Sequence, residues 1–155
     1  AVAQFYVRAK ERAYLNEVVE KVKNIAKGAS FMAGATLEIS NYELSYDDMI
    51  TNQALSEIFT KNLKQTSKLP IKEAKQSYGS IDMGNVSHVV PAIHPYIGMN
   101  KPGLVAHTKE FADQTITEDG FQTLISGALA LAGTGFDIIT DKKLLESIKR
   151  EFHNK

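Results

Sequence analysis

The fold prediction starts from residues 79–87, which read Gly79-Ser80-Ile81-Asp82-Met83-Gly84-Asn85-Val86-Ser87. This stretch lies in a longer segment, residues 78–111, that holds three of the 4 histidines, three of the 4 prolines and four of the 10 glycines. Because proline and glycine interrupt regular structure, we predict an irregular segment between two helical regions. Loops held by a rigid scaffold carry many binding and catalytic residues, so we expect the chemistry of the protein in this segment.

Composition limits the classes of function. A chain of 155 residues that is 43% hydrophobic can bury a core and form one or two small domains. Its 18 basic and 18 acidic residues balance, so no overall field favours nucleic acid or an anionic membrane. Without cysteine, any metal must be bound by His, Asp or Glu. No apolar run approaches the roughly 20 residues that span a bilayer, and no signal sequence begins the chain. We therefore expect a cytoplasmic protein whose partners are small molecules or proteins.

Residues 1–40 predict a strand, a helix and a second strand. The first strand, at residues 4–9, begins almost at once, and the chain opens at Ala1 without methionine, so we expect it to start inside a domain. Residues 35–40 alternate apolar and polar side chains, as a half-buried strand does. Between them an amphipathic helix would pack on the sheet. Its apolar face comprises Tyr14, Leu15, Val18, Val19, Val22, Ile25, Ala26 and Ala29.

Three further amphipathic helices are predicted, each with a capping residue at its start. Asn52 opens the first, Thr117 the second and Asp141 the third. Their predicted inward faces are Leu55, Ile58, Phe59 and Leu63; then Leu124, Ile125, Ala128, Leu131 and Ala132; and finally Leu144, Leu145, Ile148 and Phe152. Between the first and second of these helices, residues 65–72 are polar and include Pro70, which predicts a linker with a domain boundary near Lys68.

The histidines of the irregular segment each allow a chemical and a structural interpretation. His107 follows a Pro-Gly loop and has Thr108 and Glu110 close by in sequence, which suits an imidazole held in one tautomer as a metal ligand. A packed or solvated histidine fits the same pattern. His94 lies in an apolar run and could be a core histidine, and the alternation around His88 would point it outward from a strand.

Two further polar residues are candidates for binding a substrate. Arg8 ends the first predicted strand, where its guanidinium could hold a carboxylate through two parallel hydrogen bonds, or simply be solvated. Asp82 lies between Ser80 and Gly84, where a short carboxylate can also bond the backbone of its own loop. The sequence contains no phosphate-binding glycine loop, no serine elbow and no paired zinc-binding histidines.

The order of these pieces resembles a known family. Residues 79–87, followed by Val90-Pro91, His94-Pro95 and His107-Thr108, resemble the C-terminal part of the M20 metallopeptidase and amidohydrolase family. They look most like the branch that contains aminobenzoyl-glutamate hydrolase and M20-domain-containing protein 2. Residues 6–9, 25–29 and 52–55 look like the second half of the inserted lid domain of that family. Ile81 departs from the family pattern, where a polar residue is usual.

The resemblance implies an α/β fold in two parts. Residues 1–67 would be the second half of a ferredoxin-like lid or dimerisation domain, and residues 68–155 the C-terminal half of a zinc-peptidase-like catalytic domain. The implied enzyme hydrolyses an amide bond next to a free carboxylate, in an acyl-amino acid or a dipeptide-like substrate. It uses one or two divalent metal ions, Zn or Mn.

The resemblance also assigns roles to residues. His107 matches a metal ligand, whereas Arg8, Asp82, Asn85 and His94 are predicted to bind substrate. The general-base glutamate and the other ligands would lie in an N-terminal half outside this chain, so no catalytic residue is expected here and the chain alone should be inactive. That N-terminal half and a second copy of the chain are the expected protein partners. A non-enzymatic oligomerisation or interaction module is the alternative.

Overall fold

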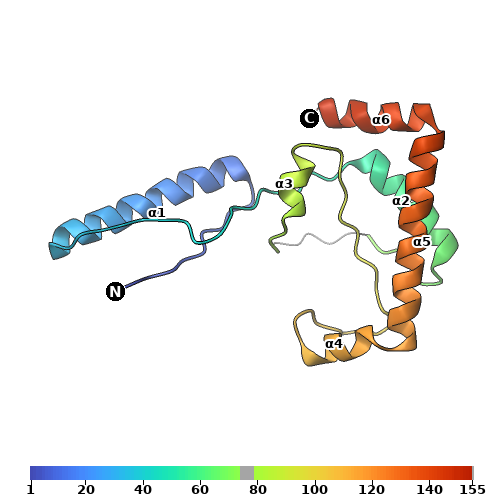
Figure 1. Cartoon of the computed structure of the whole chain (residues 1–155), viewed down its shortest axis with the longest axis horizontal. Helices are drawn as coiled ribbons and strands as arrows, with labels where there is room; N and C mark the ends of the chain where they lie inside the picture. The colour runs from blue at the N-terminus through green and yellow to red at the C-terminus, as the bar shows by residue number, and fades with distance from the viewer. Residues whose placement is uncertain (74–78, 155) are drawn as a thin grey trace. The chain divides into compact units, whose positions relative to one another are not determined.

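The computed structural model describes residues 1–73 and 79–154. Contacts divide the chain into two compact units, which we describe separately: unit 1 comprises Ala1–Met49 and Ser77–His88, and unit 2 comprises Ile50–Gln76 and Val89–Lys155. The boundary predicted near Lys68 falls within unit 2, just after a helix. The helices of the described residues (Figure 1) are α1 Arg12–Ala33, α2 Gln53–Thr66, α3 Met83–Ser87, α4 Lys109–Thr115, α5 Glu118–Thr140 and α6 Lys142–His153.

The predicted α/β fold is wrong, because the regular structure of the described residues is helical and includes no strand. Their β pairing is limited to an isolated parallel bridge between Thr51 and Ala92. Residues 4–9 and 35–40, both predicted as strands, have no regular structure. Alternating side chains favour an extended backbone, but a strand also needs a neighbour for its N–H and C=O groups. These segments find no such neighbour in the described part of the chain.

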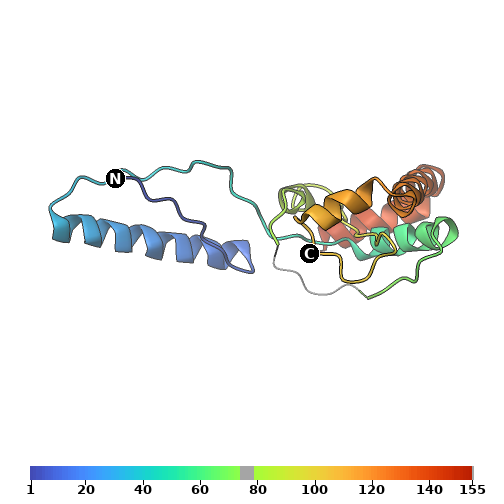
Figure 2. The same cartoon turned by 90° about the horizontal axis from the view of Figure 1, so that it is seen from below.

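In unit 1, the predicted amphipathic helix is present as α1, but no residue of it is buried. Tyr14 and Ile25 of its predicted apolar face are exposed, since the sheet expected to cover them is absent from the described residues. The helix ends at Gly34, whose φ of 64° is the left-handed conformation that glycine adopts readily. After this turn the chain runs back along α1 (Figure 2).

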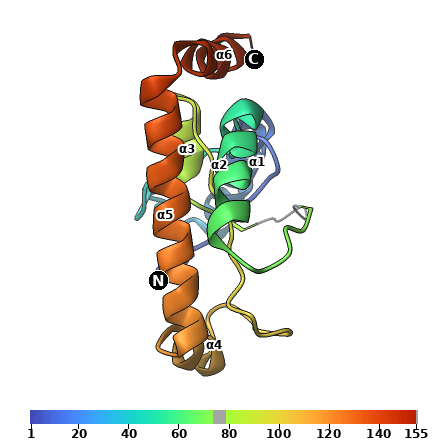
Figure 3. The same ribbon diagram turned by 90° about the vertical axis from the view of Figure 1, so that its right-hand side faces the viewer.

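The core of unit 2 lies between α2 and α5, which run side by side (Figure 3). Phe59 and Leu63 of α2 pack with Ala130 of α5, and Ile93 and Ile97 add to the cluster. The predicted start of α2 is confirmed, because the Asn52 side chain accepts a hydrogen bond from Leu55 N. Its predicted inward face is also confirmed, with Phe59 and Leu63 buried and Leu55 and Ile58 half-buried.

The face of α5 that packs on α2 is the opposite of the predicted one. Ser126, Ala130 and Thr134 are buried, whereas Leu124 and Leu131 are 68% and 59% exposed. The other residues of the predicted inward face, Ile125, Ala128 and Ala132, are exposed as well. A helix pattern shows which residues share a side of the helix, but only the neighbouring elements decide which side is covered.

The C-terminal helix α6 packs against the N-terminal end of α2. Asp141 caps α6 as predicted, accepting hydrogen bonds from Lys143 N at 2.9 Å and Leu144 N at 3.2 Å. Ile148 is buried, and the rest of its predicted stripe, Leu144, Leu145 and Phe152, is half-buried. The backbone oxygen of Ile148 accepts a hydrogen bond of 3.0 Å from the Asn52 side chain. Asn52 therefore both caps α2 and holds α6 in place.

Candidate functional site

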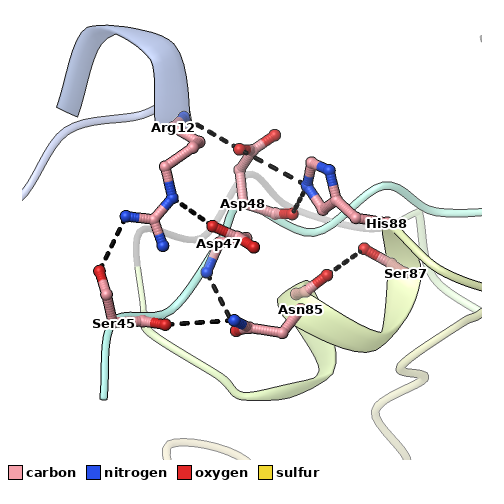
Figure 4. Close-up of polar contacts among 8 residues, drawn as sticks. Arg12, Ser45, Asp47, Asp48, Asn85, Ser87 and His88 are labelled. Carbon is pink, nitrogen blue, oxygen red and sulfur yellow. Dashed lines mark hydrogen bonds and ion pairs between the residues drawn. The ribbon is translucent and has the colours of Figure 1, made fainter. Parts of the chain in front are cut away.

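A cluster of polar side chains in unit 1 joins three segments that are distant in sequence (Figure 4). It connects the first residue of α1, the polar segment before residue 49 and the short helix α3. We call it the Arg12 cluster, and its members are Arg12, Ser45, Asp47, Asp48, Asn85 and His88. Of these residues, the sequence prediction included only Asn85 as a site residue.

Arg12 binds the segment before residue 49 through three groups. Its Nε pairs with the Asp47 carboxylate, and its second guanidinium nitrogen donates to Ser45 Oγ at 2.8 Å. The backbone N–H of Arg12 donates to Asp48 Oδ1 at 3.0 Å. An acceptor on a free N–H of the first helical turn also stabilises the positive end of the helix. These bonds hold the start of α1 on the returning chain.

Asn85 holds the same segment from the other side. Its Oδ1 accepts from Asp47 N at 3.1 Å, and its Nδ2 donates to Ser45 O at 3.1 Å. Both halves of the amide therefore bond to backbone. The neighbouring Gly84 is buried, and a Cβ placed on it would lie 1.9 Å from Asp47 O. Only glycine allows α3 to approach this closely.

His88 completes the cluster. Its Nε2 is 2.9 Å from Asp48 O and 3.8 Å from Asp48 Oδ1. Because a carbonyl oxygen can only accept, Nε2 must carry the proton in this contact. The prediction of a strand around His88 is wrong, since Val86 and Ser87 belong to α3 and His88 caps its C-terminal end.

Arg8 lies against the motif that predicted the function. Its guanidinium donates to Ser80 Oγ at 2.8 Å and lies 5.6 Å above the ring of Tyr6. The structure therefore brings together two regions that the sequence singled out, residues 6–9 and 79–87. A guanidinium has five N–H donors, so an exposed arginine bonded in this way retains donors for a carboxylate.

Tyr6, whose ring contacts Arg8, belongs to a small hydrogen-bonded network with Tyr42 and Glu43. Hydrogen bonds with Tyr42 and then Glu43, together with the negative charge of Glu43, raise the pKa of the Tyr6 hydroxyl to about 12. The hydroxyl is 3.1 Å from Glu43 Oε1, and the rings of Tyr6 and Tyr42 meet edge to face at 5.9 Å. The negative carboxylate disfavours loss of the Tyr6 proton.

Asp82 precedes α3 and is exposed. Its carboxylate makes no capping hydrogen bond to the helix. Its backbone oxygen instead accepts a 3.0 Å bond from Asn85 N. The predicted structural use of the Asp82 side chain within its own loop is therefore not found, and its substrate-binding role stays a prediction.

The two predicted site histidines of unit 2 are both exposed. His94 meets Tyr96 edge to face at 5.1 Å, so the interpretation as a core histidine is wrong. His107 has a φ of 64°, the left-handed conformation that is uncommon for a residue other than glycine. Thr108 follows it, but its hydroxyl caps α4 by accepting from Phe111 N at 3.2 Å and donates to Val105 O at 2.7 Å. The Thr108 hydroxyl therefore bonds to backbone groups at the start of α4 and not to the His107 imidazole.

The predicted site residues are divided between the units. Arg8, Asp82 and Asn85 belong to unit 1, and His94 and His107 to unit 2. In the described part of the chain, no three His, Asp or Glu side chains are grouped so that they could hold a metal ion. A catalytic zinc needs about three protein ligands. The described residues do not by themselves make such a site, and the ligand role of His107 stays a prediction.

Sequence reasoning missed Arg12, Asp47 and Asp48. The signal was weak: two adjacent carboxylates in a polar, tyrosine-rich segment that suggested only a turn. Their partner is 35 or 36 residues away in sequence, and no local pattern predicts that pairing.

Two curated dipeptidases are similar to this chain over nearly its whole length. No protein-family model matches the chain. A Xaa-Arg dipeptidase of Mus musculus is 31% identical over 151 residues, which is 96% of this chain and 35% of the mouse protein. A Xaa-Arg dipeptidase of Homo sapiens is 30% identical over 151 residues, 96% of this chain and 34% of the human protein. The chain thus spans about a third of the length of these curated relatives, and over that third it is a distant homologue of dipeptidases.

Proposed function

We propose that this chain is the C-terminal portion of an M20-type metal-dependent amidohydrolase or peptidase, and that it is inactive alone. The complete cytoplasmic enzyme hydrolyses an amide bond next to a free carboxylate. The observation that carries the proposal is the similarity to two dipeptidases over 96% of the chain. The relatives are named for Xaa-Arg dipeptides, so a dipeptide that ends in arginine is the first substrate to test.

Arg8 is the residue of this chain best suited to bind the substrate carboxylate. It is exposed, and its bond to Ser80 at 2.8 Å orients the guanidinium beside residues 79–87. A carboxylate can accept two parallel hydrogen bonds from one guanidinium, a geometry that lysine cannot reproduce. Arg8 would thereby select substrates with a free C-terminus.

His107 would contribute a single imidazole to a divalent metal site, with Zn or Mn bound by further groups outside this chain. Its side chain is exposed, which leaves the imidazole accessible to such groups. We therefore assign no chemical step to the residues of this chain. The general base and most of the ligands belong to the remainder of the enzyme.

A non-enzymatic oligomerisation module is the second candidate, and one observation favours it. The 22 residues of α1 include no buried residue, and Tyr14, Ile25, Phe31 and Met32 are exposed. Exposed apolar side chains gathered on one element often mark a protein interface. Two copies of the chain could associate through this helix whether or not the chain belongs to an enzyme.

A chimera tests the proposal. This chain would replace the matched 151-residue region of the mouse dipeptidase, and hydrolysis of a dipeptide ending in arginine would be measured with added zinc or manganese. We expect the chimera to be active and this chain alone to be inactive. His107→Ala should abolish the activity and reduce bound metal while leaving the circular dichroism unchanged. His153→Ala, a matched change of an exposed histidine in α6, should preserve both activity and metal.

Two results would reject the proposal. Turnover by this chain alone, in material shown to contain no longer polypeptide, would contradict its dependence on the remainder of an enzyme. A folded chimera that is inactive, together with a discrete dimer of the chain that α1 variants disperse, would favour the module instead.

A further inference from the structure

The outer side of α5 is apolar and exposed along most of the helix. We call it the outer face of α5, and its large members are Phe121, Leu124, Ile125, Leu131, Phe136 and Ile139, between 50% and 83% exposed. Between Asp119 and Asp137 the helix has no charged residue. At 100° per residue these side chains, with Leu129, cover an arc of roughly 160°. Soluble proteins rarely leave so continuous an apolar surface uncovered.

The inner side of α5 is the more polar one. Ser126 Oγ donates to Thr66 O at 2.8 Å, and the Asn62 side chain reaches Thr134 at 3.4 Å and Asp137 at 3.1 Å. These groups face α2 and are satisfied there. The helix therefore buries its polar side within unit 2 and presents its apolar side outward, the reverse of an ordinary surface helix.

A membrane is a poor occupant for the outer face. Contrary to the expectation from the sequence that no apolar run could span a bilayer, α5 is long and apolar enough to cross one. However, α2 runs along α5 and carries Lys61 and Lys64, and Lys61 lies 4.0 Å from Asp137. Inserting α5 would bring these charges toward hydrocarbon, where charged side chains are costly. A protein surface would leave them in water.

We propose that the outer face of α5 docks an apolar protein layer formed by the part of the hydrolase that the relatives have and this chain does not match. This inference rests on the proposed function. About two thirds of the mouse relative lies outside the matched region, which is enough chain for such a layer. A second copy of α5 would cover only the narrower stripe of a helix pair, whereas an arc of roughly 160° requires a broader surface.

The test compares two single substitutions on α5 that introduce the same charge. Leu131→Glu changes the outer face, and Gln122→Glu changes an exposed polar position of the same helix. In this chain alone, Leu131→Glu should leave the urea midpoint unchanged and reduce the binding of a hydrophobic dye. In the chimera with the mouse dipeptidase, the same substitution should lower the midpoint by roughly 1 M urea. Gln122→Glu should change neither the dye binding of this chain nor the urea midpoint of the chimera.

A second measurement covers failure of the chimera to fold. The unmatched region of the mouse dipeptidase, purified separately, should bind this chain, and Leu131→Glu should weaken that binding about tenfold because it buries an unpaired charge. Leu124→Glu should repeat the effect. The inference would be overturned if Leu131→Glu and Gln122→Glu had equal effects on the stability of the chimera and on binding of the mouse region. It would also be overturned if the chimera did not fold and the mouse region did not bind this chain.

Other outcomes separate the possible occupants and the two proposals. A discrete dimer that Leu131→Glu splits would assign the face to a second copy. Binding to vesicles of phosphatidylcholine and phosphatidylglycerol that Leu131→Glu abolishes would assign it to a membrane. A destabilised Leu131→Glu chimera whose parent hydrolyses no dipeptide would support the docking surface and reject the proposed function. An active chimera whose urea midpoint does not change with Leu131→Glu would support the proposed function and reject the docking surface.

Discussion

Gly84 lies directly against Asp47, so closely that a Cβ on Gly84 would be 1.9 Å from the Asp47 carbonyl oxygen. The contact joins α3 to the segment that returns from α1. Gly84→Ala should therefore destabilise unit 1 by about 2 kcal/mol or more, because backbone and not a flexible side chain would have to move. Urea unfolding followed by circular dichroism measures the change.

Gly28→Ala is the matched control for Gly84→Ala. Gly28 lies inside α1, and a Cβ there meets nothing within 4 Å. Alanine favours the helix over glycine, so this variant should be more stable by about 0.5 to 1 kcal/mol. Equal stability of the two variants would show that α3 does not pack on Asp47 as described.

The ion pair of Arg12 with Asp47 should contribute measurable stability. Both side chains are about one quarter exposed, at 25% and 24%, and Arg12 also bonds Ser45. A double-mutant cycle with Arg12→Ala and Asp47→Ala should give a coupling free energy of about 1 kcal/mol. The pair of Lys109 with Asp113 is 82% and 60% exposed, and its cycle should give a smaller value. Equal couplings would contradict the role given to Arg12.

The Glu151 carboxylate should stabilise the junction of α2 and α6. Its two oxygens accept from Gln53 N at 2.6 Å and Ala54 N at 2.8 Å, at the positive end of α2. Glu151→Gln should cost about 1 kcal/mol of unfolding free energy, since the amide lacks the charge and has a single acceptor oxygen. Glu146→Gln, at an exposed position of the same helix, should have little effect in the same urea titration.

Tyr6 should ionise late in an alkaline titration. Its folded-state pKa of about 12 exceeds the ordinary value of about 10. A raised pKa means that these contacts contribute fully to stability below pH 10 and that their contribution is lost as the pH rises through about 12. Ultraviolet titration should show a late-ionising tyrosine that Tyr6→Phe removes.

Glu43→Gln should bring the ionisation of Tyr6 to lower pH, because the variant lacks the negative charge. Glu38→Gln changes another exposed carboxylate of unit 1 and should leave the Tyr6 titration as it was. A titration indifferent to Glu43→Gln would show that the carboxylate does not contact the hydroxyl.

Arg8→Lys in the active chimera should affect binding of the free carboxylate. We expect KM for a dipeptide ending in arginine to rise about tenfold, since lysine keeps the charge but lacks the planar fork. KM for the corresponding C-terminal amide should not change. Arg150→Lys, an exposed position of α6, serves as the control. An equal rise for acid and amide would indicate a structural role for the Arg8 bond to Ser80.

The candidate site could be predicted only in part. The family resemblance singled out residues 6–9 and 79–87, and the structure brings them together through Arg8 and Ser80. The resemblance did not predict that both halves of the Asn85 amide bond to backbone, at Ser45 and Asp47. Those partners lie about 40 residues earlier, and sequence patterns describe spacing along one element, not pairing between elements.

The sequence by itself determined where α2, α5 and α6 begin. Asn52, Thr117 and Asp141 begin helices as predicted, because a capping side chain bonds the N–H groups of its own first turn. Only the tertiary structure decided that residues 4–9 and 35–40 form no strand and that α5 turns Ser126 inward and Leu131 outward. Capping and helical period are local, whereas strand pairing and burial depend on which surface lies opposite.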